Sequence, residues 1–130
     1  DRQLLIPEGT ARHSWVTRED CARAAAGALA GRINDSGPLD VTGPEALGFA
    51  DLAQRLSTLS GKTVTAQVLP EKEILARVLA KGIPETAAGF VVGFAGWTAR
   101  EVSTSPTDTV ERASGSKPAS VDAELSTLVI

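Results

Sequence analysis

The chain has 130 residues and a formal net charge of −3, and 42% of its residues are hydrophobic. A chain of this size buries roughly two thirds of the surface that its unfolded form exposes, so it can form a core without metals or disulfides. The single cysteine cannot form an internal disulfide. Together with the single histidine it cannot form a zinc site of three or four nitrogen and sulfur ligands. The composition therefore predicts a globular domain that binds no metal.

Charge and hydropathy patterns argue against two classes of partner. The 13 basic and 16 acidic residues are interspersed, so a nucleic-acid partner is not expected. No apolar run approaches the roughly 18 residues of a membrane span, and the N-terminus lacks a signal-peptide pattern. We therefore expect no membrane partner and a cytoplasmic location.

Several residue types and motifs are missing from the sequence. It contains no Met, so we expect that Asp1 is not a translation start and that the chain is a processed or truncated piece of a longer product. It contains no Tyr, which excludes a tyrosine general acid, and neither G-x-G-x-x-G nor G-x-x-x-x-G-K-[ST] occurs. Nucleotide chemistry would therefore need residues from outside these 130 positions.

The first part of the chain predicts two strands around a helix. Leu4–Ile6 is expected to form a short buried strand, and residues 39–42 a second short strand. Thr17 is expected to cap a helix that runs to Ala30, with Gly31 as its left-handed end. The apolar positions of this helix predict a stripe of mostly small residues that packs closely on a sheet: Ala22, Ala25, Ala26 and Leu29.

The middle of the chain continues the alternation. A helix is expected from Phe49 to Gly61, and a strand over residues 63–69 with Val64, Ala66 and Val68 on its buried face. Pro70 is expected to start a further helix that ends at Gly82. Its inward residues should be Ile74, Leu75, Val78 and Leu79. This order of strands and helices predicts an α/β fold.

A helix over residues 83–100 is expected to carry three aromatic residues on one face, since Phe90, Phe94 and Trp97 follow one another at spacings of four and three. Such a face is usually part of a core. The alternative is that the rings line a substrate pocket, where a flat quinone or similar aromatic would stack on them. Each of the three glycines of this helix costs about 1 kcal/mol against alanine, which predicts a weak helix. Short helices are expected over residues 108–113 and 121–127.

Three segments carry motifs in a fixed order: Ser14–Ala25 reads SWVTREDCARAA, Asp40–Leu47 reads DVTGPEAL, and Gly115–Ser120 reads GSKPAS. In this combination they resemble the carboxy-terminal half of NmrA-like atypical short-chain dehydrogenases. Within that group the chain is most similar to NAD(P)H quinone oxidoreductases. The similarity extends over nearly the whole chain.

The resemblance implies the C-terminal part of a Rossmann-type parallel-sheet fold with a small, mostly helical substrate-covering subdomain. Residues 1–47 would hold the last sheet strands and their packing helix, and residues 48–130 the substrate-side subdomain. The implied function is the substrate-side portion of an NAD(P)H-dependent oxidoreductase that passes hydride to an acceptor such as a quinone. NADP or NAD would be bound mainly by residues outside this chain, so the isolated chain would be inactive. Phe90, Phe94 and Trp97 would bind the acceptor.

Two other functions stay open. The chain could belong to a non-catalytic NmrA-type protein that senses the NAD(P) pool and signals to a protein partner. It could also be a self-associating binding module, whose second copy covers exposed sheet edges and apolar helix faces. A homo-oligomer, or packing against the missing N-terminal half, is therefore expected.

The sequence identifies no catalytic residue and no cofactor-binding residue. His13 and Ser14 are adjacent, but neighbours on an extended segment point to opposite sides, so a surface or sheet-edge histidine is favoured over a catalytic one. Cys21 is expected to have a packing role. A charge cluster at the helix start is expected to cap and pair within its helix, in preference to contacting a cofactor or the missing half: Arg18, Glu19, Asp20 and Arg23.

Overall fold

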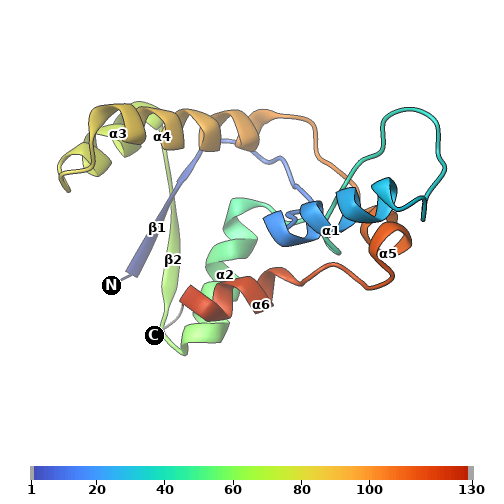
Figure 1. The fold of residues 1–130 in the computed structure, drawn as a ribbon. Coiled ribbons are helices and arrows are strands. Elements are labelled where there is room, and N and C mark those ends of the chain that lie inside the picture. Colours follow the sequence, from blue (N-terminus) through green and yellow to red (C-terminus); the bar gives the residue numbers. More distant parts are fainter. Residues whose placement is uncertain (1, 129–130) are drawn as a thin grey trace. The chain divides into compact units, whose positions relative to one another are not determined.

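The structure, a computed structural model, describes residues 2–128 and divides into two compact units (Figure 1). Residues up to 12 together with residues 48–103 form one, which we call the sheet unit. Residues 13–47 and those from 104 on form the other, which we call the helical unit. The functional division at residue 47 stays a prediction, because these units are defined by compactness alone.

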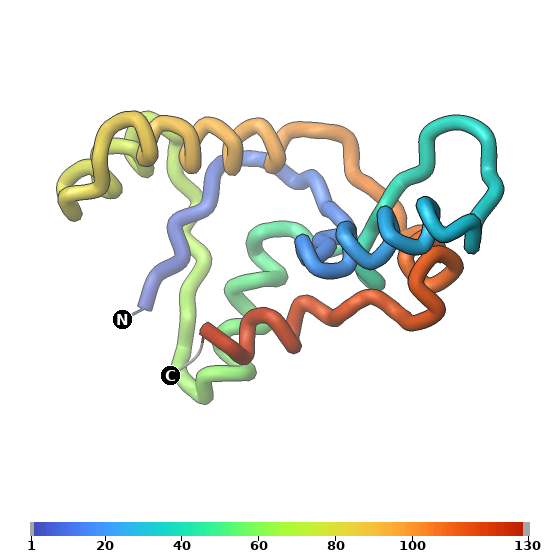
Figure 2. Tube along the Cα trace, in the orientation of Figure 1, coloured from blue at the N-terminus to red at the C-terminus, as the bar shows by residue number. Residues whose placement is uncertain are grey.

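The sheet unit is built on two parallel strands, β1 (Arg2–Pro7) and β2 (Val64–Leu69), which run side by side (Figure 2). Arg2 lies opposite Val64, and Pro7 lies opposite Leu69. Helix α2 (Phe49–Ser60) precedes β2, packs on it, and ends at Gly61 in the left-handed conformation with φ 63°. Two parallel strands can be joined only by a long crossover connection, and α2 is part of the one between β1 and β2. The predicted α/β fold class is confirmed.

Two further helices complete the sheet unit. Helix α3 (Glu71–Leu79) and helix α4 (Glu85–Arg100) pack on each other, and both contact β1. Their side chains bury a small core of apolar residues. Its buried members are Leu69, Ile74 and Val92, with Leu5, Leu75 and Val78 packed against them.

The predicted burial pattern of β2 and α3 is partly wrong. Val68 was expected inside but is 58% exposed, while Leu69 is buried. The alternation fails at this end of the strand because α3 begins directly after Pro70 and Leu69 packs into its core with Ile74. Leu79, also expected inside, is exposed in the last turn of α3.

The helical unit contains helix α1 (Arg18–Leu29), helix α5 (Thr109–Ser114) and helix α6 (Val121–Leu128). The predicted cap of α1 is confirmed, because the Asp20 N–H donates to Thr17 Oγ1 at 2.9 Å. Gly31 follows the helix with φ 73°, as expected. Helices α1 and α5 pack together around a core of three buried residues: Ala24, Val110 and Ala113.

The buried face of α1 differs from the prediction. The expected stripe is wrong, since Ala22, Ala25 and Ala26 are exposed and Leu29 is 91% exposed. The buried positions are instead Asp20, Ala24 and Gly27. Close packing does occur, but against α5: a Cβ at Gly27 would collide with the Ala113 carbonyl.

The strand predicted over residues 39–42 is also wrong, because the structure assigns no strand there. This segment is held by hydrogen bonds to threonine side chains and not by the backbone hydrogen bonds of a sheet. The Thr107 N–H donates to Thr42 Oγ1 at 2.7 Å, and Thr107 Oγ1 donates to the Asp40 carbonyl at 2.8 Å. Within residues 2–128, no helix combines the length and apolar character needed to cross a membrane.

Candidate functional site

Helix α4 has two faces of different character. One face is buried in the sheet unit and consists mainly of small residues: Ala88, Val92, Gly96 and Ala99. The opposite face carries Phe90, Phe94 and Trp97, which we call the aromatic stripe. These side chains are 74%, 53% and 53% exposed, respectively. Among the described residues, the aromatic stripe is therefore not part of a core.

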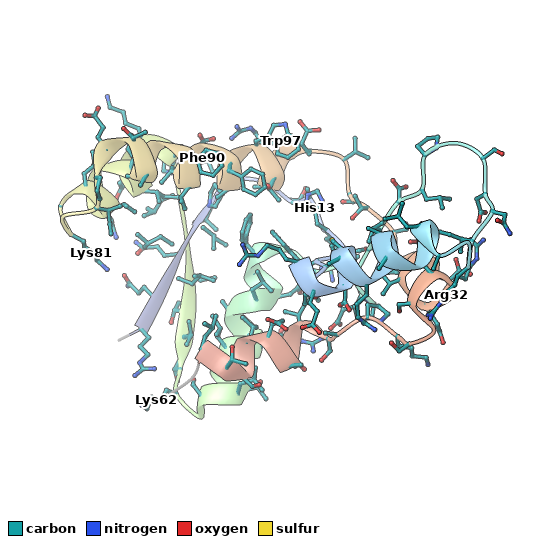
Figure 3. All side chains as sticks on the ribbon, viewed as in Figure 1. His13, Arg32, Lys62, Lys81, Phe90 and Trp97 are labelled. Atoms are coloured by element: carbon teal, nitrogen blue, oxygen red, sulfur yellow. The ribbon has the colours of Figure 1, made fainter. Side chains whose placement is uncertain are left out.

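The rings of the aromatic stripe contact one another along the helix. The ring centroids of Phe90 and Phe94 are 6.2 Å apart with an interplanar angle of 13°, and those of Phe94 and Trp97 are 5.8 Å apart at 39°. Figure 3 labels the two end rings, Phe90 and Trp97. Leaving a large apolar side chain in water forgoes about 1.5–3 kcal/mol of burial, and a contiguous exposed patch often marks a binding site. The predicted shared face is confirmed, and its role stays a prediction.

The C-terminal end of α4 is fixed by contacts within the sheet unit. Arg100 Nη1 forms an ion pair with Glu71 Oε1 on α3. The Ala11 N–H donates to the Ala99 carbonyl at 3.1 Å. Gly9, with φ 148°, lies so close to this carbonyl that a Cβ would collide with it. The rings are therefore carried on a helix whose backbone is held from two sides.

The three glycines of α4 have unequal surroundings. Gly96 lies against the Glu71 carboxylate, whereas a Cβ at Gly89 or Gly93 would meet no atom of residues 2–128 within 4 Å. The two open glycines therefore serve no packing purpose among the described residues, although each costs about 1 kcal/mol in a helix. In the sequence these glycines predict a weak helix, and their position around the aromatic residues favours a pocket-lining role for the rings. Their spacing of four, beside the aromatic residues, was the available signal of a common surface.

An ion pair between the buried Asp20 and the half-buried Arg23 anchors α1 in the helical unit. Asp20 is 2% exposed, pairs with Arg23, and accepts the Ala119 N–H at 2.8 Å. Burial raises the pKa of Asp20, but hydrogen bonds from the Arg23 side chain, the Ala119 N–H and Thr17, together with the Arg23 charge, outweigh it and lower this pKa below its usual value. Arg23 also binds Ser114 at 3.3 Å. Through these contacts the ion pair joins α1 to the end of α5 and to the segment that follows it.

The structure does not place Ser14, His13 or Cys21 in a recognisable catalytic arrangement. Ser14 Oγ donates to the Thr104 carbonyl at 3.2 Å, so its proton is committed there. The His13 ring lies edge-on to Trp15, with centroids 6.1 Å apart. Cys21 is exposed, so its expected packing role is wrong. The described part of the chain contains no group of three histidine, cysteine or acidic residues able to hold a metal ion.

The fold is similar to that of one class of solved proteins. The chain has the fold of the carboxy-terminal part of NADPH-dependent reductases. It superimposes on the NADPH-dependent quinone oxidoreductase of Escherichia coli, solved with NADPH, with a TM-score of 0.78 and 24% identity, covering 97% of this chain and 44% of that one. The triphenylmethane reductase of Citrobacter sp. gives a TM-score of 0.82 at 22% identity, over 97% of this chain and 43% of that one.

Comparison of sequences agrees with this class. An NAD(P)H azoreductase from Xenophilus azovorans is 29% identical over 86 residues, 66% of this chain and 30% of the relative. The uncharacterized oxidoreductase YesF of Bacillus subtilis is 26% identical over 119 residues, 92% of this chain and 42% of the relative. No protein-family model matches the chain. The resemblance to quinone oxidoreductases is confirmed, and the chain spans less than half the length of these proteins.

Proposed function

We propose that this chain is the acceptor-side portion of an NAD(P)H-dependent oxidoreductase. In this proposal the aromatic stripe binds a flat acceptor such as a quinone. The observation that carries it is the row of three exposed rings in mutual contact on α4. Each stacked ring pair contributes about 0.5–1.5 kcal/mol beyond the burial of its area. Several such contacts suit a planar aromatic ligand.

The cofactor is proposed to be NADP or NAD, bound mainly by residues outside this chain. The similarity to reductases solved with NADPH or NADP(H) supports this assignment. The sequence itself has no glycine-rich phosphate-binding motif that could cradle a dinucleotide. The bound nicotinamide would supply hydride to the acceptor.

The residues of this chain then act by binding and orientation. The rings would hold one face of the acceptor and exclude water from that face, which strengthens electrostatic interactions at the other. The fixed end of α4, held through Arg100 and Ala99, would keep the rings in one position while the acceptor is bound. We assign no proton transfer to a residue of this chain.

Binding to the 130-residue chain tests the proposal directly. Anthraquinone sulfonate is a suitable probe, because its fused outer rings leave no position open to addition of the Cys21 thiol. We expect calorimetry to detect binding, and Phe94→Ala to weaken it about tenfold, the equivalent of about 1.4 kcal/mol. Leu29→Ala, which removes an even more exposed apolar side chain from α1, is the matched control and should leave affinity unchanged.

The assignment of the cofactor has its own test. NADPH added to the chain alone should give no calorimetric signal of micromolar binding. Micromolar affinity would overturn the proposal that the nucleotide site lies elsewhere. In a full-length parent protein, NADPH oxidation with a quinone would support the reductase, while tight cofactor binding without turnover would support the sensing alternative. The cytoplasmic location stays a prediction.

A further inference from the structure

The two open glycines lie on the same side of α4 as part of the aromatic stripe. Because successive residues of an α-helix are rotated by about 100°, one sector about 100° wide contains six positions. They are Thr86, Gly89, Phe90, Gly93, Trp97 and Arg100. No described atom would contact a Cβ at Gly89 or Gly93. A glycine without an internal packing partner lets another backbone approach the helix closely. The neighbouring rings could then cover that backbone.

This sector is complementary to itself in the reversed direction. A two-fold axis at Gly93 brings together positions that are equally far before and after this residue. Trp97 is four positions after Gly93 and Gly89 four before, so each indole would fill the gap at the glycine of the other copy. Such a contact is isologous, since both copies use the same surface. Interlocking of rings with gaps is the usual basis of helix packing.

The charges of α4 also favour an antiparallel second copy. Glu85 lies in its first turn and Arg100 in its last. Reversal places Arg100 opposite Thr86, next to Glu85, whereas a parallel arrangement would put like charges together. Arg100 already binds Glu71, but its guanidinium has five N–H donors and its side chain is 56% exposed. Glu101, just past the helix, falls opposite Glu85 of the second copy, so the attraction at this end rests on Arg100 alone.

We infer that two copies of this chain pair through α4, antiparallel and crossing at Gly93, and that the pairing covers the aromatic stripe. Stable complexes bury roughly 1,200–2,000 Å² of surface, and one helix from each copy buries less than this. The pairing is therefore weak and reversible. The acceptor and the second copy then compete for one surface. This competition rests on the proposed function, while the pairing itself does not.

Sedimentation equilibrium over a series of concentrations up to the millimolar range measures the pairing. Gly93→Ala adds a Cβ at the crossing point, and we expect it to weaken pairing tenfold or more. The same change should raise the melting temperature, because alanine favours the helix and the added Cβ would meet no described atom within 4 Å. Opposite effects on pairing and stability separate loss of the interface from misfolding. Ala87 is exposed but lies outside the sector, so Ala87→Leu should leave the strength of pairing unchanged.

The charge contribution is tested by Glu85→Lys, which should weaken pairing several-fold. Added salt should weaken the pairing of the unaltered chain in the same direction. A chain that stays monomeric at millimolar concentration, or a Gly93→Ala variant that pairs as well as the original, would overturn the inference.

Competition is tested by adding anthraquinone sulfonate to the paired chain, which should shift it to monomer. Persistent pairing with the probe bound at Trp97 would show that the competition is wrong and leave the proposed function intact. Pairing without any binding of the probe would instead contradict the proposed function and leave the pairing intact.

Discussion

Helices α1 and α4 are both rich in alanine and glycine but use these residues in opposite ways. In α1, Gly27 is buried, and its missing side chain admits the carbonyl of Ala113 on α5. In α4, Gly89 and Gly93 face open space beside exposed rings. A small residue in a helix therefore signals close approach without saying whether the approaching group belongs to the same chain. The neighbouring side chains, polar and paired on α1 but aromatic on α4, distinguish the two cases.

The anchors of the two helices differ as well. The Asp20 carboxylate of α1 is buried and joins residues 99 positions apart through its bond to Ala119. The Arg100–Glu71 pair of α4 is considerably exposed. Buried charge-assisted hydrogen bonds contribute more to stability than exposed ion pairs. We therefore expect substitutions in α1 to affect folding, and substitutions on the open face of α4 to affect binding.

The largest effect should come from filling the space at Gly27. Gly27→Leu forces a side chain against the Ala113 carbonyl and separates α1 from α5. Overpacking of this kind lowers the free energy of unfolding by about 3 kcal/mol. Urea unfolding followed by circular dichroism measures the change. A stability equal to that of the original chain would contradict the close contact between these helices.

Removal of the buried carboxylate should have the next largest effect. Asp20→Asn loses charge-assisted bonds to Arg23 and Ala119, so we expect the free energy of unfolding at neutral pH to fall by about 2 kcal/mol. Asp108→Asn is the matched control, because Asp108 is 71% exposed, and its change should stay below about 0.5 kcal/mol.

The effect of Asp20 should also depend on pH. Because the pKa of Asp20 is lower in the folded chain than in the unfolded chain, its stabilisation is complete above the unfolded value of about 3.9. This stabilisation is lost as the pH falls through the folded value. The difference in stability between the original chain and Asp20→Asn should therefore begin to shrink as the pH falls below about 4, and should vanish only below the pKa of folded Asp20. A constant difference across this range would exclude the ionised carboxylate as its cause.

Gly89→Ala should stabilise the chain, in contrast to substitution of Gly27. The added methyl group meets no described atom, and alanine is favoured over glycine in a helix by about 1 kcal/mol. Thermal unfolding should show a higher melting temperature. A lower one would mean that this face of α4 is covered within the chain.

The smallest change in stability is expected for the aromatic stripe itself. Phe90 is 74% exposed, so Phe90→Ser should alter the free energy of unfolding by less than about 0.5 kcal/mol. Affinity for anthraquinone sulfonate should nevertheless fall in the same variant. A large loss of stability would instead assign Phe90 to packing.

Local signals in the sequence predict most element boundaries. Thr17, Gly31 and Gly61 mark helix ends where the structure places them, because capping depends on short-range backbone geometry. The buried face of α1 could not be predicted in this way, since alanine fits either face of a helix. The burial of Asp20 depends on Ala119, far along the chain.

Distant contacts also explain the error at residues 39–42. The hydrogen bonds of Thr42 go to Thr107, 65 positions away, and a local pattern of alternating residues does not reveal them. For the candidate site, the spacing of the aromatic residues was sufficient to predict a shared face. The direction of that face depends on which side of α4 packs on α3 and β1.

The two tryptophans allow the most direct test of the aromatic stripe as an acceptor-binding surface. Trp97 lies in the stripe, whereas Trp15 lies in the helical unit and donates its indole N–H to the Leu47 carbonyl at 2.9 Å. The two indole N–H resonances can be followed by NMR during titration with anthraquinone sulfonate. We predict a saturable shift of the Trp97 resonance with the Trp15 resonance unchanged. An unchanged Trp97 resonance, or equal shifts of both, would contradict acceptor binding by the aromatic stripe.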